Sequence, residues 1–381
     1  MRRGKRQLQE RLFRGNTENL IFRVALNLVL SDSLGPAQKI ISRFASLKDI
    51  FQSSPEKLMT LGLEEEKARA LNSPAIFDQA GRVLDWVSKK GYFLLTPDDP
   101  NYPETLREIF DPPYVLYGAG NPEILKEPAV AVVGARRPTP YGRAVAERLA
   151  RDLAGRGLVV VSGMALGIDS IAHWGALAEG KTVAVLGSGL DNIYPRENKS
   201  LFWKIAGRGA VVSEFPPGMP PFAFHFPLRN RIISGLSLAV VVVEAAGRSG
   251  SLITARLALE QGREVMAVPG NVTSGLSRGC HWLIKSGAKL VETWEDVVEE
   301  FSLPLRERFL ARRAEEKEKM PELSSQEKMI VDCLKTDEVT HIDELAEATA
   351  ASVSEILAIL LYLELKGLVH QVPGKYFQRS L

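Results

Sequence analysis

The stretch FPLRNRIISGLSLAVVVVEAAGRSGSLITA, from Phe226 to Ala255, decides the fold of this chain. It holds the most apolar run of the sequence, Leu238–Ala245, with two arginines before it and a Gly/Ser loop after it. Consecutive valines with no polar alternation predict a strand that is covered on both faces, as strands of parallel sheets are. We therefore predict a buried strand whose neighbouring turns bind phosphate groups, and we expect these phosphates to belong to a polymer.

Six further apolar runs predict strands of the same sheet. They are Ala129–Gly134, Leu158–Gly163, Thr182–Gly187, Ala210–Glu214, Glu264–Gly270 and Ala288–Val291. Amphipathic segments such as GRAVAERLARDLAGRG separate most of these runs and predict helices. The alternation indicates an α/β domain over residues 100–300 with a mostly parallel sheet. In such sheets ligands bind beyond the carboxyl ends of the strands.

The segments on either side of this domain predict additional modules. Residues 17–90 read as short helices, in which LGPAQKIISRF is typical of a helix-hairpin-helix or SAM-like module. A bundle that only packs or docks onto a partner explains the same pattern. Residues 301–321 are dense in charge and predict a linker.

Residues 322–381 give three helices followed by a short hairpin, the pattern of a winged-helix domain. Such a domain either binds DNA or docks a protein, because a fold alone does not fix a function. Its third helix, Ser354–Lys366, has few basic residues, which argues against DNA recognition by this domain.

Composition restricts the class of protein. A chain of 381 residues suggests two or three domains, and a formal net charge of +2 requires any nucleic-acid site to be a local basic patch. Cys280 and Cys333 lie far apart, so we expect two free, buried or half-buried thiols in a reducing compartment. No apolar run reaches the roughly 18 residues of a membrane span, and the basic N-terminus has no apolar run behind it. We expect a soluble cytoplasmic protein without a membrane partner.

Groups suited to phosphate follow several of the predicted strands. Glycines in these loops allow close approach of a ligand, helix N-termini favour anions, and arginine forks match phosphate oxygens. The candidates for phosphate contact are Arg136, Arg137, Arg196, Lys199, Arg229, Arg231, Ser249, Gly250 and Ser251. Aromatic residues lie beside two of these arginines, at Phe222, Phe224, His225 and Phe226. They suit either base stacking or the core.

The sequence is poor in groups for catalysis. Asp169 and His173 are four residues apart, which suits either an acid/base pair or a helix-stabilising polar pair. The run Gly175–Thr182 matches the P-loop formula, but here the helix precedes the strand, which is the reverse of a true P-loop. The dinucleotide fingerprint and clustered metal ligands are missing as well, so we expect no cofactor and no metal.

Several long motifs together resemble the DNA-processing protein A (DprA/Smf) family. They are VAVVGARRPTPYG, SGMALGIDSIAHWGAL, GSGLDNIYPREN, SEFPPGMPP, FPLRNRIISGLS and EAAGRSGSLITA, in this order between about Tyr102 and Val291. The resemblance implies an extended Rossmann-like domain that binds single-stranded DNA without cutting it, forms homodimers and loads RecA recombinase during natural transformation. It also implies DNA contacts by Arg136, Arg196, Arg229, Arg231 and the loop Ser249–Ser251. The chain departs from the family pattern at His281, where relatives often have Asn.

Two other functions stay open. Lysine-decarboxylase-like enzymes that hydrolyse nucleotides share a Rossmann-like core, but their catalytic Glu follows the glycine loop. Here no acidic residue follows in the turn after the loop, and Glu244 precedes it. A nucleotide sensor that signals through the winged helix is the third interpretation.

Overall fold

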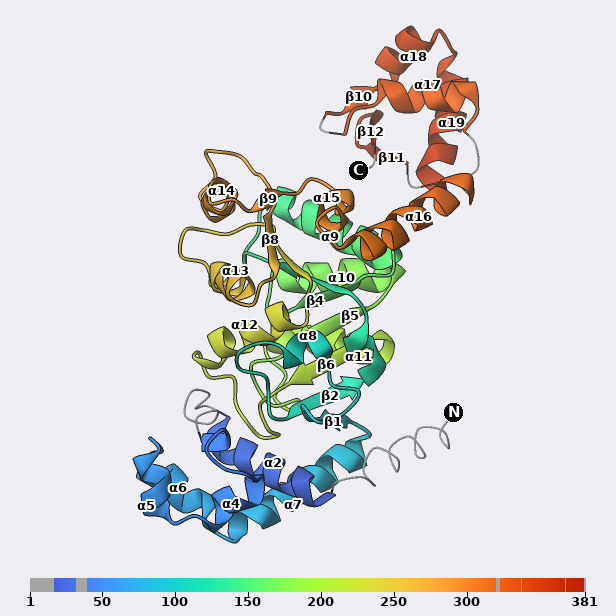
Figure 1. Ribbon diagram of the computed structural model, residues 1–381. Helices are drawn as coiled ribbons and strands as arrows, with labels where there is room; N and C mark the ends of the chain where they lie inside the picture. Colours follow the sequence, from blue (N-terminus) through green and yellow to red (C-terminus); the bar gives the residue numbers. More distant parts are fainter. Residues whose placement is uncertain (1–16, 32–39, 320–322, 337, 367, 380–381) are drawn as a thin grey trace. The chain divides into compact units, whose positions relative to one another are not determined.

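The computed structural model describes residues 17–31, 40–319, 323–336, 338–366 and 368–379. By the contacts within it, the chain divides into two compact units, Met1–Leu310 and Ala311–Leu381. Figure 1 shows the first unit as a large sheet between layers of helices, with a further group of N-terminal helices.

The sheet of the first unit has nine strands in the order β1-β2-β6-β5-β4-β3-β7-β8-β9. Their bounds are β1 Phe93–Leu95, β2 Leu116–Gly120, β3 Ala129–Val133, β4 Val159–Ser162, β5 Thr182–Val185, β6 Ala210–Ser213, β7 Ala239–Val242, β8 Glu264–Ala267 and β9 Lys289–Leu290. Every neighbouring pair from β6 to β9 is parallel, and β2 runs antiparallel to both β1 and β6. All seven predicted apolar runs form strands, so the prediction of a mostly parallel α/β sheet is confirmed.

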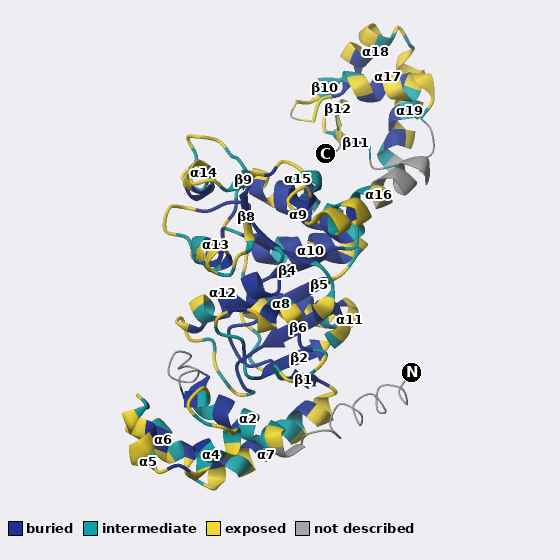
Figure 2. Ribbon diagram, viewed as in Figure 1, coloured by how far each residue is buried: buried dark blue, intermediate teal, exposed yellow. Residues whose placement is uncertain are grey.

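Helices cover both faces of the sheet, which explains the unbroken valines (Figures 1 and 2). Val240 and Val242 pack into the cluster that holds residues of α8, α12, α13 and α14, and Val241 packs into the cluster of α9, α10 and α15. The bounds on the first face are α8 Glu104–Arg107, α12 His225–Gly235, α13 Gly250–Glu260 and α14 Arg278–Lys285. Those on the second are α9 Pro140–Gly155, α10 Ile168–Glu179 and α15 Trp294–Val298.

The N-terminal helices pack partly against the end of the sheet. They are α2 Thr17–Leu30, α4 Leu47–Gln52, α5 Pro55–Thr60, α6 Glu65–Leu71 and α7 Ala75–Lys90. Val24 and Ile76 share a buried cluster with Tyr117 of β2 and with side chains of α11 (Lys199–Arg208). The helical character of this region is as predicted. The helix-hairpin-helix segment lies partly outside the described residues, which omit 32–39.

The segment that we expected to be a linker contains helix α16, Leu303–Lys319, and its residue Phe309 is buried against the core of the first unit. The second unit has the predicted winged-helix elements. They are α17 Ser325–Cys333, β10 Thr340–His341, α18 Ile342–Thr349, α19 Val353–Leu365, β11 Val369–Val372 and β12 Tyr376–Arg379. Within the described ranges no single helix is long and apolar enough to cross a membrane; α18 and α19 pass that test only together, as a pair bent by 109°.

Both cysteines are free thiols, as predicted. Cys280 is buried, with its Sγ 3.5 Å from the carbonyl oxygen of Val242 and 3.4 Å from that of Val243. Burial raises the pKa of this thiol to about 12. Cys280 therefore serves packing beneath β7.

Candidate nucleic-acid interface

A pocket of about 510 Å³ opens beyond the carboxyl ends of β3, β4, β5 and β7. This is the place where parallel sheets bind ligands, and the volume is within the usual range for ligand sites. The side chains and loops that line it include Gly134, Arg136, Ala165, Asp169, Tyr194, Phe226, Arg229, Asn230, Ser249, Gly250, Ser251 and Thr254. Segments that follow five different strands, β3 to β7, therefore meet at one site.

An aromatic ring with two arginines is the centre of this pocket. The guanidinium carbon of Arg136 lies 5.8 Å from the centroid of the Phe226 ring, and that of Arg229 lies 5.9 Å from it. Tyr194 adds a second ring 5.7 Å from Phe226. A Cβ at Gly187 would stand 2.9 Å from the Phe226 ring, so this close approach requires glycine there. Arg136 is exposed, and the ring fixes it in place.

Arg229 is a buried cation at the back of the pocket, only 4% exposed. Its Nη1 donates to the carbonyl oxygens of Gly163 and Val185, at the ends of β4 and β5. Burial lowers the pKa of Arg229 to about 10, an effect that Asp169 opposes, so the group is charged at neutral pH. Arg229 thus joins α12 to two strand ends and places a fixed positive charge in the pocket.

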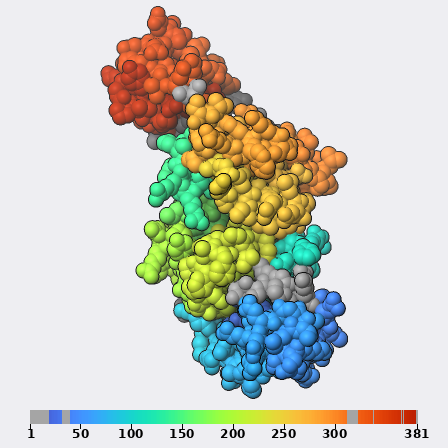
Figure 3. Space-filling view, turned by 90° about the vertical axis from the view of Figure 1, so that its left-hand side faces the viewer, coloured from blue at the N-terminus to red at the C-terminus, as the bar shows by residue number. Residues whose placement is uncertain are grey.

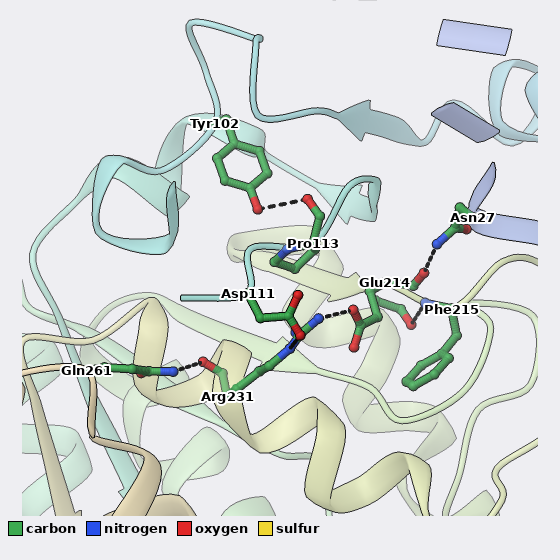
Figure 4. A network of polar contacts seen from close by, with 9 residues as sticks. Asn27, Tyr102, Asp111, Pro113, Glu214, Phe215, Arg231 and Gln261 are labelled. Carbon is green, nitrogen blue, oxygen red and sulfur yellow. Dashed lines mark hydrogen bonds and ion pairs between the residues drawn. The ribbon is translucent and has the colours of Figure 1, made fainter. Parts of the chain in front are cut away.

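Arg231 does not line the pocket, and its guanidinium faces two carboxylates instead (Figure 4). Its Nη2 lies 2.5 Å from Oε2 of Glu214 and its Nε lies 3.4 Å from Oδ2 of Asp111. Its side chain is only 8% exposed. The reason is that Arg229 and Arg231 lie on a helix, α12, where residues two apart point to different sides.

The first turn of α13 supplies backbone amides to the pocket. Ser249 is the N-cap, and its Oγ accepts from the backbone N–H of Ser251 at 3.3 Å. No atom lies within 4 Å of where a Cβ of Gly250 would stand, so the backbone is open to a ligand. The N-terminus of a helix favours anions because its first N–H groups lack partners and its dipole is positive there. The structure therefore brings Ser249, Gly250 and Ser251 together with Arg136 and Arg229.

Three predicted cations stand outside the pocket lining. Arg137 follows Arg136 in the loop after β3, Arg196 begins the 3₁₀ helix η2 (Arg196–Asn198), and Lys199 begins α11. All three are exposed, and within the described part of the chain none of them forms an ion pair. Their role in binding stays a prediction.

The aromatic run at the start of α12 divides between the two interpretations. Phe222 and Phe224 are exposed and stack on each other, with their ring centroids 5.6 Å apart. His225 is buried, and its ring stacks on Phe215 at 4.0 Å. Phe226 is half-buried and lines the pocket. One ring therefore belongs to the candidate site and one to the core.

Asp169 and His173 do not form the polar pair that their spacing suggested. Oδ2 of Asp169 accepts from the backbone N–H of Ala165 at 3.4 Å, and burial raises the pKa of this carboxyl, opposed by Arg229. Nδ1 of His173 lies 2.7 Å from Oγ1 of Thr182, whose hydroxyl donates to the carbonyl oxygen of Val160. Nδ1 therefore carries the proton, and burial lowers the pKa of His173 to about 3. Each residue has its own structural partner.

The motifs with an enzymatic meaning also have structural roles. The carboxylate of Glu244 accepts from the backbone N–H of Thr139 at 2.9 Å and from its hydroxyl at 2.6 Å. Thr139 is the N-cap of α9, so Glu244 fixes the loop that carries Arg136. In Gly175–Thr182, the segment that matches the P-loop formula, α10 ends at Glu179 before β5 begins at Thr182, in the order that we predicted.

The sequence reasoning missed Tyr194 as part of the site. Tyr194 stands in the motif NIYPREN, from which we had taken only the cations. An aromatic residue two positions from an arginine was the available signal. His281, the departure from the family pattern, has its Nε2 3.0 Å from the carbonyl oxygen of Gly270 and so contacts the loop after β8.

Comparison with known proteins identifies two matching family models. The model of DNA recombination-mediator protein A matches residues 93–302, and the model of the DprA winged helix domain matches residues 314–375. Among similar proteins, Smf of Escherichia coli is 43% identical over 297 residues, which cover 77% of this chain and 79% of that protein. The DNA processing protein DprA of Streptococcus pneumoniae is 51% identical over 234 residues, covering 60% of this chain and 83% of that protein.

Two solved structures extend the likeness. The X-ray structure of DprA from Streptococcus pneumoniae superposes with a TM-score of 0.61 at 39% identity, covering 74% of this chain and 98% of that one. DprA from Helicobacter pylori, described for its single-stranded DNA binding mode, gives a TM-score of 0.50 at 35% identity, covering 54% of this chain and 93% of that one. Since the first family model spans more than half of the sequence, the chain belongs to the DNA recombination-mediator protein A (DprA/Smf) family.

Proposed function

We propose that this protein binds single-stranded DNA without cleaving it and acts as a recombination mediator in natural transformation and DNA processing. The observation that carries the proposal is the exposed Arg136, held 5.8 Å from Phe226 at a pocket that Arg229 and the N-terminus of α13 make positive. The relative from Helicobacter pylori, which is described as binding single-stranded DNA, supports the same conclusion.

The chemistry of the pocket suits an unpaired strand. Arginine and helix amides bind phosphate oxygens, and Phe226 and Tyr194 offer rings to a base. A base inside a duplex is already stacked on its neighbours, and exposing it costs a few kcal/mol. We therefore expect the protein to prefer single strands over duplexes.

Fluorescence anisotropy with labelled single- and double-stranded oligonucleotides, repeated at several salt concentrations, tests this function. For a single strand, log K should fall with log salt by roughly 0.7 per phosphate neutralised. Arg136→Ala combined with Arg196→Ala should weaken binding to all sequences about equally. Arg151→Ala is the matched control, since this arginine is exposed on α9 and does not line the pocket. Unchanged affinity in the double variant would contradict a role of Arg136 and Arg196 in DNA binding.

The partner of the bound strand is the second part of the proposal. The family description as a recombination mediator supports the loading of RecA recombinase onto the strand, an activity that belongs in the cytoplasm. The measurement is the rate at which RecA assembles on single-stranded DNA that is already covered by a single-strand binding protein. We expect this protein to raise the rate, and the Arg136→Ala and Arg196→Ala double variant to fail.

Self-association is the third part. Trp282, Leu259 and Leu290 are exposed by 60%, 62% and 41%, near the edge strand β9 and an apolar cavity of about 610 Å³ between α13 and α14. These two helices form much of the face seen in gold and orange in Figure 3. Exposed apolar patches on soluble proteins mark interfaces, so we assign the homodimer contact to this face. Light scattering should give the mass of a dimer for the natural protein and of a monomer for Trp282→Arg.

We propose no catalytic role. Glu244 is engaged with Thr139, and Asp169, which does line the pocket, accepts from the backbone N–H of Ala165. The alternative, a nucleotide-hydrolysing enzyme, predicts release of free base from nucleoside monophosphates. An assay for that release with folded protein decides between the two, and release at a steady rate would overturn the non-catalytic assignment.

A further inference from the structure

We propose that the DNA site continues beyond the pocket along helix α11, with Trp203 as a second platform for base stacking and Lys199, Lys204 and Arg208 as its phosphate contacts. These four residues are called the α11 track. The inference rests on the proposed function and adds to it a site for further nucleotides of the same strand.

The α11 track begins where the candidate site ends. The 3₁₀ helix η2, which starts at Arg196, leads directly into α11 at Lys199. Trp203 lies four residues after Lys199 and therefore one helical turn, about 5.4 Å, further along the same side. Leu201, Phe202 and Ile205 occupy the opposite, buried side of α11. Figure 2 shows this division, with exposed residues on the outer surface of the helix.

Trp203 is a large aromatic side chain held at the surface. Trp203 is 54% exposed, and its ring meets that of the buried Phe202 at a centroid distance of 5.0 Å and an angle of 78°. This perpendicular contact fixes the ring without covering it. An exposed, fixed indole ring is suited to stacking, because any base offers a flat face to it.

Two of the three cations of the α11 track, Lys204 and Arg208, are oriented before any ligand arrives. Nζ of Lys204 lies 4.3 Å from the ring centroid of Trp174, which α10 presents at the surface. Nη1 of Arg208 donates to the carbonyl oxygen of Leu177 at 2.6 Å. Groups that are already ordered lose less conformational freedom on binding phosphate.

The charge of α11 favours a nucleic acid over a protein as the occupant. The helix carries Lys199, Lys204 and Arg208 and has no acidic residue along its length. The nearest acidic residues in the sequence are Glu197 in η2, before the helix, and Glu214, which follows it and is buried. Aromatic rings among cations, in continuity with a phosphate-binding rim, are the arrangement with which proteins follow a single strand.

The test compares Trp203→Ala with Trp203→Phe, and Lys204→Ala with Lys285→Ala, an exposed lysine on α14. Each protein is titrated with single-stranded oligonucleotides of increasing length. We expect Trp203→Ala to match the natural protein on the shortest oligonucleotides and to bind the longer ones at least about 5-fold more weakly, the low end for loss of one stacked base. Trp203→Phe should keep most of the affinity. Lys204→Ala should weaken binding only of the longer strands, and Lys285→Ala should have no effect.

Three outcomes would overturn the α11 track. Equal affinity of Trp203→Ala and the natural protein at every length would leave this surface to a protein partner. An equal loss of affinity at every oligonucleotide length would mean that Trp203 supports binding in the pocket itself and is not part of a separate extension of the site. If Trp203→Phe lost as much affinity as Trp203→Ala, stacking would not be the contribution of this residue. Failure of the proposed function is distinct, because the natural protein would then bind no oligonucleotide at all.

Discussion

Replacing Arg231 with Met should destabilise the protein and leave the chemistry of DNA binding intact. Arg231 lies two residues after Arg229 in the motif RNR, so from the sequence alone its replacement would be expected to remove a phosphate ligand. The structure gives it another function, because its guanidinium joins Glu214, directly after β6, to Asp111 in the loop before β2 (Figure 4). Removing the cation leaves these carboxylates buried without a counter-charge.

The expected loss of stability follows from the burial of the three groups. The side chains of Glu214 and Arg231 are 3% and 8% exposed, and breaking a buried pair of this kind costs about 3 to 5 kcal/mol. Asp111 is more exposed and contributes less. Domains are usually stable by about 5 to 15 kcal/mol, so the variant should fold but unfold at a much lower denaturant concentration.

The pH dependence of this loss is a specific signature. Burial already raises the pKa of Glu214 and of Asp111, and the loss of Arg231 should raise both further. A carboxyl with a raised folded pKa stabilises the fold at low pH, and this contribution is lost as the pH rises through that pKa. The free energy of unfolding that Arg231→Met loses relative to the natural protein should therefore be small near pH 4 and largest above neutral pH. Glu214→Gln in the same chain should recover part of it.

Urea unfolding followed by tryptophan fluorescence measures the effect in the right part of the molecule. The five tryptophans all lie before residue 311, so the signal reports the first unit and not the winged helix. Oligonucleotide affinity is measured in parallel at a temperature where the variant is folded. The reasoning is refuted if Arg231→Met unfolds like the natural protein at pH 8, or if it stays stable but loses the salt dependence of DNA binding.

Two further predictions concern other buried polar groups. His173→Asn keeps a hydrogen-bond donor toward Thr182 but removes a titrating group. The pKa of His173 is about 3 in the folded protein and about 6.5 in the unfolded chain, so the stability of the natural protein falls as the pH drops below 6.5. Between pH 8 and pH 5, urea unfolding should show that the natural protein loses about 2 kcal/mol more stability than the variant. An identical pH profile would contradict the burial of the neutral imidazole. Glu244→Gln replaces charge-assisted hydrogen bonds to Thr139 by neutral ones and should lower the free energy of unfolding by about 1 to 2 kcal/mol. It should also loosen the loop that carries Arg136, and so weaken oligonucleotide binding without changing how steeply the affinity falls with salt. A normal urea midpoint in that variant would show that Glu244 does not hold the loop.

The sheet could be predicted from the sequence because its signal is local. Val240 and Val241 face opposite sides of β7 and both are fully buried, so the run shows no polar alternation. The same reasoning located the carboxyl-end loops, and with them Arg136 and the Ser249–Ser251 turn. These predictions depend only on strand burial and on the rule that parallel strands present their ends together.

Helix α12 could not be predicted in the same way. It is buried on nearly every side, so it lacks the apolar stripe by which a surface helix is recognised. We therefore treated Arg229 and Arg231 as neighbours at a strand end, with one shared role. Their separation depends on helical geometry, and the partner of Arg231 lies 17 residues earlier in the chain. The partner of His173 likewise comes from the next strand and not from its own helix.

The arrangement of buried charges answers why so apolar a segment lies between arginines and a glycine-serine turn. Arg229 holds the ends of β4 and β5, and Glu244 holds the loop after β3, so the exposed Arg136 stands on a layer of buried polar contacts. Loss of affinity alone cannot identify a phosphate ligand here, since a change in the supporting layer also displaces the rim. The salt slope separates the two cases. Removing a residue that neutralises a phosphate should lower the slope by about 0.7, whereas removing a supporting residue should weaken binding and leave the slope unchanged.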